Sequence, residues 1–247
     1  MSGFRHRSRQ AQFAIALPRY RRIWRRYQHL TLIGRRRYIG NLHLVADTLG
    51  NADLAEGAIV ECGCWKGGMA CGLLEIAGDF RDFHFFDSFE GLPPAKPIDG
   101  QSAIDWQHDT DADNYYDNNR ADVEPFRRQV KAVATDGQRL HIHKGWFDQT
   151  LSSFPPDQSI AVLRLDGDWY ESTMTCLETL FDRVMPGGIV IIDDYLTWDG
   201  CTRAVHDFLS SRKAAEGLRQ SRFGGVHYIV KAPTTAEASD LSAGVAG

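Results

Sequence analysis

The stretch of sequence that decides the fold runs from Ile160 to Asp194 and reads IAVLRLDGDWYESTMTCLETLFDRVMPGGIVIIDD. It contains two apolar segments, residues 160–165 and 188–192, and an aspartate follows each of them directly. Residues 170–184, which lie between them, are predicted to form a helix. Near-continuous apolar strands joined by a helix are typical of a parallel sheet that helices cover on both faces.

The same alternation continues on both sides of this stretch. Further strands are predicted at residues 58–60, 83–86, 140–143 and 224–230, and further helices around residues 73–76 and over residues 202–212. The pattern contains no internal repeat and no second domain. We therefore predict a single α/β domain over residues 46–232 with a mostly parallel sheet, an N-terminal helical arm at 1–45 and a flexible tail at 233–247.

The composition is that of an ordinary globular protein. The chain has 247 residues, of which 43% are hydrophobic and 24% are charged, which excludes a disordered, collagen-like or disulfide-stapled small protein. No apolar run approaches the roughly 18–20 residues that a membrane-spanning helix needs. Five cysteines are an odd number, so we expect reduced thiols and a cytoplasmic location.

Charge is distributed unevenly along the chain. Residues 1–37 contain 11 arginines and no acidic residue, and all 32 acidic residues lie further on. The arginines fit helices docked on the chain's own acidic body or on a second copy, an anionic partner, or a cleaved targeting segment. Aromatic residues interleaved with arginine at 20–27 favour docking. We therefore expect a homodimer or higher homo-oligomer that uses these helices, and no nucleic-acid partner.

One segment interrupts the alternation. Residues 93–124 begin with two prolines, are rich in aspartate and follow the second strand, at the end of the sheet where α/β proteins bind ligands. A structureless connection of this length is usually functional or mobile. We expect a lid or acceptor-recognition loop, and a solvated acidic insertion is the alternative.

Acidic residues follow four of the predicted strands. Glu61 follows the first, Asp87 the second, Asp166 the fourth, and Asp193 and Asp194 the fifth. Because the carboxyl ends of parallel strands meet at one edge of a sheet, we expect these carboxylates to line one cleft. A single aspartate in such a place is commonly structural, but four acidic strand ends point to a site.

The segment that follows the first strand, ECGCWKGG at residues 61–68, is a glycine-rich turn into a helix. It includes Gly63, Trp65 and Gly67, which we expect to contact a ligand, but it matches neither the dinucleotide fingerprint nor the phosphate loop. Glu61 suits an amino group, and Asp87 lies where a carboxylate holds a ribose diol. Together they indicate a nucleoside that carries a positively charged amino acid, the constitution of S-adenosylmethionine.

The turn at Gly145 and Trp146 follows the third strand, where an aromatic ring fits either an adenine site or the core. Asp166, Asp193 and Asp194 are hard oxygen ligands without a Cys/His set, so we expect them to bind Mg²⁺, with Mn²⁺ and Ca²⁺ as alternatives. Asp168 is expected to cap the helix that begins at Tyr170. His143 is either a proton acceptor or a packed strand histidine.

Four segments together resemble the macrocin/mycinamicin O-methyltransferase family over roughly residues 40–230. They are IVECGCWKGG at 59–68, FDSFEGLP at 86–93, LRLDGDWYEST at 163–173 and GGIVIIDDY at 187–195. The resemblance implies a Rossmann-like class I methyltransferase fold with a seven-stranded sheet and one antiparallel strand. Trp169 departs from it, since the family pattern has a smaller aliphatic residue there.

The resemblance also implies residue roles. Asp166, Asp193 and Asp194 would bind the metal, with Asp166 as general base, while Glu61, Gly63, Asp87 and Ser88 would hold the methyl donor. The expected function is S-adenosylmethionine- and Mg²⁺-dependent methylation of a hydroxyl on a sugar or glycosylated natural product. A cell-envelope sugar and a catechol-like polyphenol are other possible acceptors. A metal-dependent phosphoesterase and a non-catalytic nucleoside-binding protein are the alternative functions.

Overall fold

The computed structural model describes residues 2–213 and 216–233, with side chains from residue 10 onward. In this part of the chain seven strands form one sheet, in the order β3-β2-β1-β4-β5-β7-β6. The strands are β1 (Ala58–Cys62), β2 (Asp82–Asp87), β3 (Arg139–Lys144), β4 (Ile160–Leu165), β5 (Val184–Ile192), β6 (Leu218–Gln220) and β7 (His227–Val230). Strands β1 to β5 pair in parallel, and β7 runs antiparallel to both of its neighbours. The predicted α/β class and the single antiparallel strand are confirmed.

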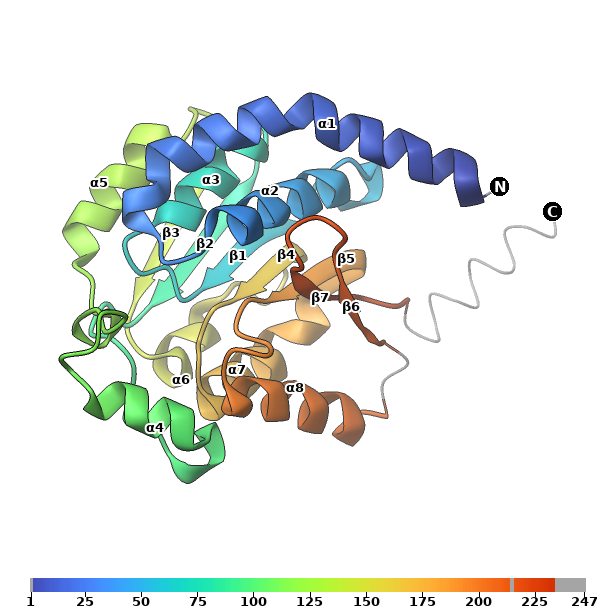
Figure 1. Cartoon of the computed structure of the whole chain (residues 1–247). Coiled ribbons are helices and arrows are strands. Elements are labelled where there is room, and N and C mark those ends of the chain that lie inside the picture. The colour runs from blue at the N-terminus through green and yellow to red at the C-terminus, as the bar shows by residue number, and fades with distance from the viewer. Residues whose placement is uncertain (1, 214–215, 234–247) are drawn as a thin grey trace.

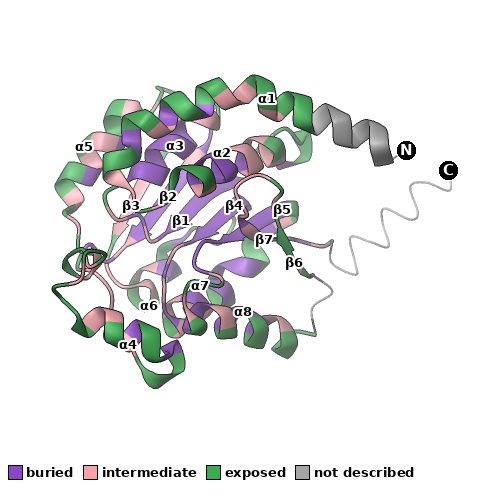
Figure 2. Cartoon of the chain, in the orientation of Figure 1, coloured by how far each residue is buried: buried purple, intermediate pink, exposed green. Residues whose placement is uncertain are grey.

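Helices cover both faces of the sheet, as Figure 1 shows. One face carries α1 (Ser2–Tyr27), α2 (Arg35–Leu49), α3 (Gly68–Ile76) and α5 (Val123–Val133), and the other carries α6 (Phe147–Thr150), α7 (Tyr170–Leu180) and α8 (Asp199–Ser211). Helix α4 (Gln101–His108) lies outside these two layers. The strands in the middle of the sheet are therefore buried on both sides, and Figure 2 shows them in purple.

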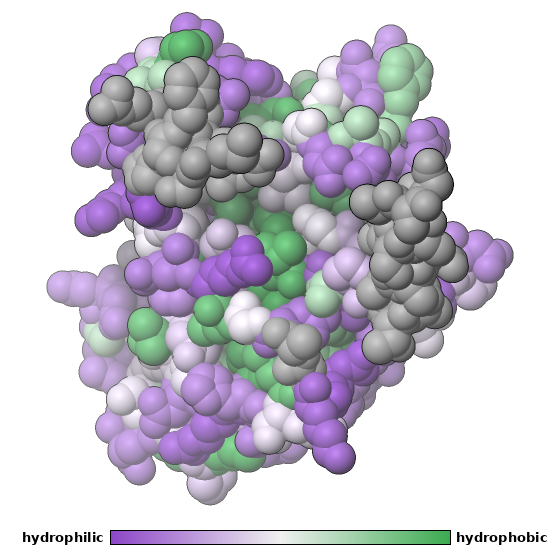
Figure 3. Space-filling model, turned by 90° about the vertical axis from the view of Figure 1, so that its right-hand side faces the viewer, coloured by the Kyte–Doolittle hydropathy of each residue, from purple (hydrophilic) through white to green (hydrophobic). Residues whose placement is uncertain are grey.

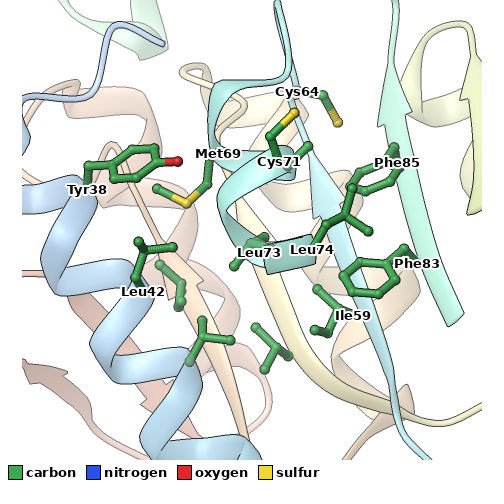
Figure 4. Packing of buried hydrophobic residues seen from close by; sticks show 14 of the residues in the cluster. Tyr38, Leu42, Ile59, Cys64, Met69, Cys71, Leu73, Leu74, Phe83 and Phe85 are labelled. Carbon is green, nitrogen blue, oxygen red and sulfur yellow. The ribbon is translucent and has the colours of Figure 1, made fainter. Parts of the chain in front are cut away.

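The core is divided by the sheet because successive side chains of a strand point to opposite faces. In β1, Ile59 belongs to the cluster under α2 and α3, while Val60 belongs to the cluster under α7 and α8. Figure 4 shows the first cluster, in which Leu42 of α2, Leu73 of α3 and Ile59 of β1 lie in one layer of apolar side chains. Removing an aliphatic side chain of this kind from water contributes about 1.5–3 kcal/mol to stability, so this packing fixes the strand order and the strand ends.

The arginine-rich helix α1 packs on the chain's own α2 and α3. Its buried positions are Tyr20, Ile23 and Tyr27, which recur with helical spacing. Those of its arginines whose side chains are described, at positions 19, 21, 22, 25 and 26, are exposed. Arg26 forms an ion pair with Glu75 of α3 at 2.5 Å, and the Tyr27 hydroxyl donates to the same carboxylate at 2.8 Å. The arm is thus part of the core, and α2 continues past the expected boundary at residue 45. A homodimer remains a prediction.

Three local predictions differ from the structure. The expected helix at 170–184 ends at Leu180, and a single 3-10 turn, Phe181–Arg183, leads into β5. The expected strand at 224–230 begins at His227, because Gly224 and Gly225 have positive φ and form the turn before it. Strand β6 was not predicted at all, since it has three residues and no apolar run.

The segment 93–124 contains regular structure and is not a structureless connection, and its role as a lid or acceptor-recognition loop stays a prediction. It contains α4 and two 3-10 turns, and it ends in the first turn of α5. Helix α4 forms because Ala103 is buried and the ring of Trp106 contacts those of Trp169 and Trp198. The segment is therefore anchored to the domain by aromatic contacts.

Figure 3 shows the side of the molecule that carries β6 and β7, where hydrophobic residues are visible in the middle and hydrophilic residues surround them. Within the described residues, no helix combines the length and the apolar character needed to cross a membrane. The tail predicted at 233–247 lies outside the described residues from residue 234 onward.

Candidate active site

A cavity of about 1080 Å³ opens where β1, β2, β4 and β5 end. Nine of the residues that the sequence singles out line it: Glu61, Gly63, Trp65, Asp87, Ser88, Trp146, Asp166, Asp193 and Asp194. Gly67, Gly145 and His143 are not among the lining residues. The prediction that acidic strand ends share one cleft is therefore confirmed by the geometry.

The glycine loop after β1 owes its shape to two residues. Gly63 has φ +88°, and a Cβ atom at this position would come within 1.8 Å of the backbone oxygen of Asp166. Gly67 also has φ +88°, and a Cβ atom there would lie 2.8 Å from the ring of Phe126. Because L-residues rarely adopt this conformation and neither site has space, both positions require glycine. Gly67 thus shapes the loop from outside the cavity.

Asp87, at the end of β2, holds the same loop in place. Its Oδ2 accepts hydrogen bonds from the backbone N–H groups of Cys64 at 2.7 Å and Trp65 at 2.8 Å, and its Oδ1 accepts one from Phe89 at 2.6 Å. Burial raises the pKa of Asp87, and these three backbone donors oppose the rise. A carboxylate has about four acceptor positions, so Asp87 still has capacity for a ligand hydroxyl.

Glu61 is buried in β1 and lines the cavity. Its Oε1 receives a hydrogen bond from Arg164 at 2.9 Å, while its Oε2 is buried and has no hydrogen-bond partner among the described residues. Burial raises the pKa of Glu61 to about 8, against the lowering effect of Arg164. A buried carboxylate oxygen without a partner is costly, and a ligand amino group would satisfy it.

Asp166, Asp193 and Asp194, which we call the aspartate triad, come together after β4 and β5. Each offers a carboxylate oxygen, and these three atoms lie within 4.8 Å of one another. Burial raises the pKa of Asp166 and of Asp194, and the carboxylate of Asp193 adds to both shifts. Such crowding favours a cation or a proton among the three groups.

Asp168 does not cap α7, so that expectation is wrong. Its own φ is +56°, and its Oδ1 accepts a hydrogen bond from the indole N–H of Trp198 at 2.8 Å. The backbone N–H of Tyr170 instead donates to Asp99 at 2.7 Å. A residue of the 93–124 segment therefore caps this helix, which sequence spacing alone does not reveal. Burial raises the pKa of Asp168 to about 8.

His143 lies in a separate cluster of side chains between β3 and the segment after α6. Its Nε2 is 3.2 Å from His84 Nδ1, and its Nδ1 is 2.9 Å from the Ser153 hydroxyl. His84 Nε2 is in turn 2.8 Å from the side-chain oxygen of Gln158. Burial lowers the pKa of both histidines, in the case of His84 to about 4. The geometry matches the packed-histidine alternative and does not support proton transfer by His143.

Gly145 and Trp146 play different parts in the turn after β3. Gly145 has φ +143°, and its N–H donates to the backbone oxygen of Asp87 at 3.0 Å, so it joins the ends of β2 and β3. Trp146 follows it and lines the cavity. Contact between Trp146 and an adenine ring remains a prediction.

Sequence reasoning missed two parts of the cavity wall. Aromatic residues Trp106, Tyr116 and Trp198 line one side, and residues 30–37, including Arg37, line another. The aromatic residues were visible in the sequence, but their convergence depends on α4. Arg164 was not predicted as a site residue either, although a charged residue inside the apolar run IAVLRL is a clear signal.

Comparisons with known proteins point in one direction. The chain matches the model of the Macrocin-O-methyltransferase (TylF) family over residues 10–229. It is 36% identical over 195 residues to the 8-demethyl-8-(2,3-dimethoxy-alpha-L-rhamnosyl)-tetracenomycin-C 4'-O-methyltransferase of Streptomyces olivaceus, covering 76% of this chain and 70% of that protein. It is 34% identical over 216 residues to the demethyldecarbamoylnovobiocin O-methyltransferase of Streptomyces niveus, covering 84% and 78%. The solved structure of the O-methyltransferase NovP is 28% identical with a TM-score of 0.65, covering 83% of each chain.

Proposed function

This chain belongs to the macrocin O-methyltransferase family and is an S-adenosylmethionine-dependent O-methyltransferase, and we propose that it methylates a sugar hydroxyl of a glycosylated natural product with the help of Mg²⁺. The observation that carries this proposal is that the aspartate triad and the glycine loop border the same cavity. A methyl donor and a metal-bound hydroxyl would then lie side by side.

The aspartate triad fits a magnesium site. All of its donor atoms are carboxylate oxygens, the ligands that Mg²⁺ prefers. Glu61 and the triad together carry four carboxylates, and three of them form ion pairs with Arg164 or Arg37. When all four are ionised, the two guanidinium groups leave two negative charges uncompensated. When bound, Mg²⁺ would supply positive charge that makes an acceptor hydroxyl easier to deprotonate.

Asp166 is the residue of the triad best suited to accept the proton. Its side chain is 28% exposed, whereas Asp193 and Asp194 are buried. The Asp166 carboxylate is therefore the one that an acceptor hydroxyl in the cavity can reach, and a positioned carboxylate can accept the proton of such a hydroxyl. In this proposal Asp166 holds the acceptor hydroxyl and removes its proton as the methyl group is transferred.

The donor would lie against the ends of β1 and β2. We propose that Glu61 receives the amino group of S-adenosylmethionine, that the backbone at Gly63 and Trp65 contacts its amino-acid part, and that Asp87 receives a ribose hydroxyl. Ser88 supports this wall, because its hydroxyl donates to the Gly91 backbone oxygen at 2.9 Å. Trp146 would contact the adenine.

The aromatic side of the cavity supports a glycosylated acceptor. The indole N–H groups of Trp106 and Trp198 already donate to Asn114 and Asp168, at 3.1 and 2.8 Å. These side chains therefore offer ring surface and no free donor, which suits the C–H face of a sugar or a flat aglycone. The name of the Streptomyces olivaceus relative describes a rhamnosyl compound as its substrate. We propose that this chain also methylates a sugar, without specifying which one.

Calorimetry with S-adenosylhomocysteine, with and without Mg²⁺, tests the proposed function first. The product nucleoside should bind. After incubation with S-adenosylmethionine and a rhamnosylated tetracenomycin or novobiocin precursor, mass spectrometry should show that the precursor has gained one methyl group. Chelation should stop that transfer. Transfer that is equally fast in excess chelator would refute the metal part of the proposal, and phosphate release from an aryl phosphate without nucleoside binding would favour the phosphoesterase.

We further propose a cytoplasmic homodimer. All five cysteines are buried free thiols, which suits a reducing compartment. On α1, Ile15 is 81% exposed on the outer side of the arm, where a second copy could cover it. Light scattering of the wild type and of Ile15→Glu tests this, and a monomeric wild type would contradict it.

A further inference from the structure

Arg164 occupies an unusual place for a charged residue. It lies in β4 at the centre of the sheet, paired in register with Glu61 of β1 on one side and with Ile191 of β5 on the other. Its side chain is 0% exposed. Burying a guanidinium group is costly unless its charge is paired, so the contacts it makes must offset a large desolvation penalty.

The guanidinium of Arg164 contacts three carboxylates at once. Its Nη1 is 2.9 Å from Oε1 of Glu61 and 2.9 Å from Oδ2 of Asp166, and its Nη2 is 2.9 Å from Oδ1 of Asp193. Burial alone would lower the pKa of Arg164, but these carboxylates raise it well above its ordinary value, so the group stays charged. One buried cation thus links the donor-binding end of the cavity to two members of the triad.

We infer that Arg164 is a positioning residue that serves as an internal counter-ion: it holds Asp166 and Asp193 in place when no metal is bound, and it competes with the metal for them. It contacts one oxygen of each carboxylate. The second oxygen of Asp193 is 3.9 Å from Nη1 of Arg37, a longer and partly exposed ion pair. The charge of Arg164 repels a divalent ion bound to the same two carboxylates. The inference rests on the proposed metal site for its second half only.

Two consequences follow from this arrangement. First, the triad is already assembled without metal, because Arg164 offsets part of the repulsion among its carboxylates. Second, the metal is bound more weakly than the bare triad would bind it, and it exchanges readily. A neutral residue in place of Arg164 should therefore destabilise the metal-free protein and strengthen metal binding.

The metal half is tested by titrating Mn²⁺ into the nucleoside-free protein in a calorimeter. Arg164→Met should lower the Kd for Mn²⁺ at least tenfold, while Arg164→Lys, which keeps the charge, should stay within threefold of wild type. Arg81→Met is the matched control, since Arg81 is also buried but donates to the backbone oxygens of Leu54 and Gly57. Its Kd should not change. Unchanged or weaker Mn²⁺ binding by folded Arg164→Met overturns the competition.

The counter-ion half is tested without metal, by urea unfolding in excess chelator. Arg164→Met should lower the unfolding midpoint, and adding Asp193→Asn, which removes one of the charges that Arg164 no longer offsets, should recover at least half of the loss. If Arg164→Met does not fold under these conditions, the double variant should restore folding. In the Arg81→Met background, Asp193→Asn should recover nothing. Absence of recovery beside Arg164→Met overturns the counter-ion role.

The two arms separate this inference from the proposed function. If wild type and Arg81→Met both fail to bind Mn²⁺, the metal proposal is wrong, and with it the competition. The urea experiment still decides whether Arg164 is the counter-ion of Asp166 and Asp193, because it contains no metal.

Discussion

Two polar clusters, each with a buried member, lie on neighbouring strands and differ in what surrounds them. One surrounds Arg164 and contains Glu61 and the aspartate triad, and the other joins His84, His141 and His143 on β2 and β3. Both contain groups whose pKa is shifted by burial. Only the first cluster lines the cavity and keeps a buried carboxylate oxygen without a partner. A shifted side-chain pKa therefore shows only that a group is buried. A cavity together with a buried polar atom that has no hydrogen-bond partner is what marks a ligand-binding site.

The largest expected effect concerns the first cluster. Asp166→Asn should lower turnover at least about 1000-fold, because it removes a carboxylate that we propose as both metal ligand and base, while the Kd for S-adenosylhomocysteine stays within a few-fold. Asp148→Asn is the matched control, since Asp148 lines the same cavity outside the triad. Kinetics and calorimetry measure the two quantities. Near-normal turnover by Asp166→Asn would show that the cluster around Arg164 is no more catalytic than the histidine cluster.

The second prediction concerns the wall beside the triad. The indole of Trp169 is 2% exposed and donates to the Pro93 oxygen at 2.8 Å, so it anchors the 93–124 segment next to Asp168. Trp169→Leu should cost about 3 kcal/mol of stability and raise the acceptor KM, with donor binding unchanged. Trp169→Phe, which keeps an aromatic ring but loses the hydrogen bond and part of the indole's volume, should cost less, about 1–2 kcal/mol. Equal losses in both variants would show that the ring does not anchor the segment.

The third prediction concerns the histidine cluster and pH. Burial lowers the pKa of folded His84 to about 4, below the roughly 6.5 of an unfolded histidine, so the unfolded chain binds more protons as pH falls. This group should therefore remove about 2 kcal/mol of stability between pH 7 and pH 5. Urea unfolding at several pH values should show a flatter dependence for His84→Asn. The exposed His29 provides the control, and His29→Asn should follow wild type.

The smallest effect is expected at His143. Because His143 faces His84 and Ser153 and does not line the cavity, His143→Asn should keep turnover within threefold of wild type. The pH optimum of turnover should be the same for His143→Asn as for the wild type. A hundredfold loss of turnover in a folded His143→Asn protein would place the second cluster in the catalytic machinery.

The sequence predicted the first cluster better than it predicted the second. Apolar runs ending in acidic residues locate strand ends, and the parallel topology brings those ends together whatever the details of packing. His143 also lies near the end of a strand, β3. Successive residues of a strand alternate between the two faces of the sheet, and His143 pairs with Phe86 on the face under α6 and α7. That register is set by tertiary contacts.

Other features could not be read from the sequence for different reasons. Strand β6 gains its pairing from β7 alone and has two exposed residues out of three, so it leaves no hydrophobic pattern. Helix α4 depends on contacts with Trp169 and Trp198, which are distant in the sequence. The cap that Asp99 supplies to α7 has the same origin. Long-range packing determined all three.

The close approach at Gly63 limits how this enzyme can diversify. Since a Cβ atom there would collide with the backbone of Asp166, the loop after β1 and the loop after β4 are in direct contact and cannot shift independently. With donor and acceptor bound as we propose, the spacing between the methyl group and the nucleophile is therefore fixed by the contact between these two loops. On the same proposal, new acceptors would be accommodated by changes in the 93–124 segment or in residues 30–37, which border other parts of the cavity.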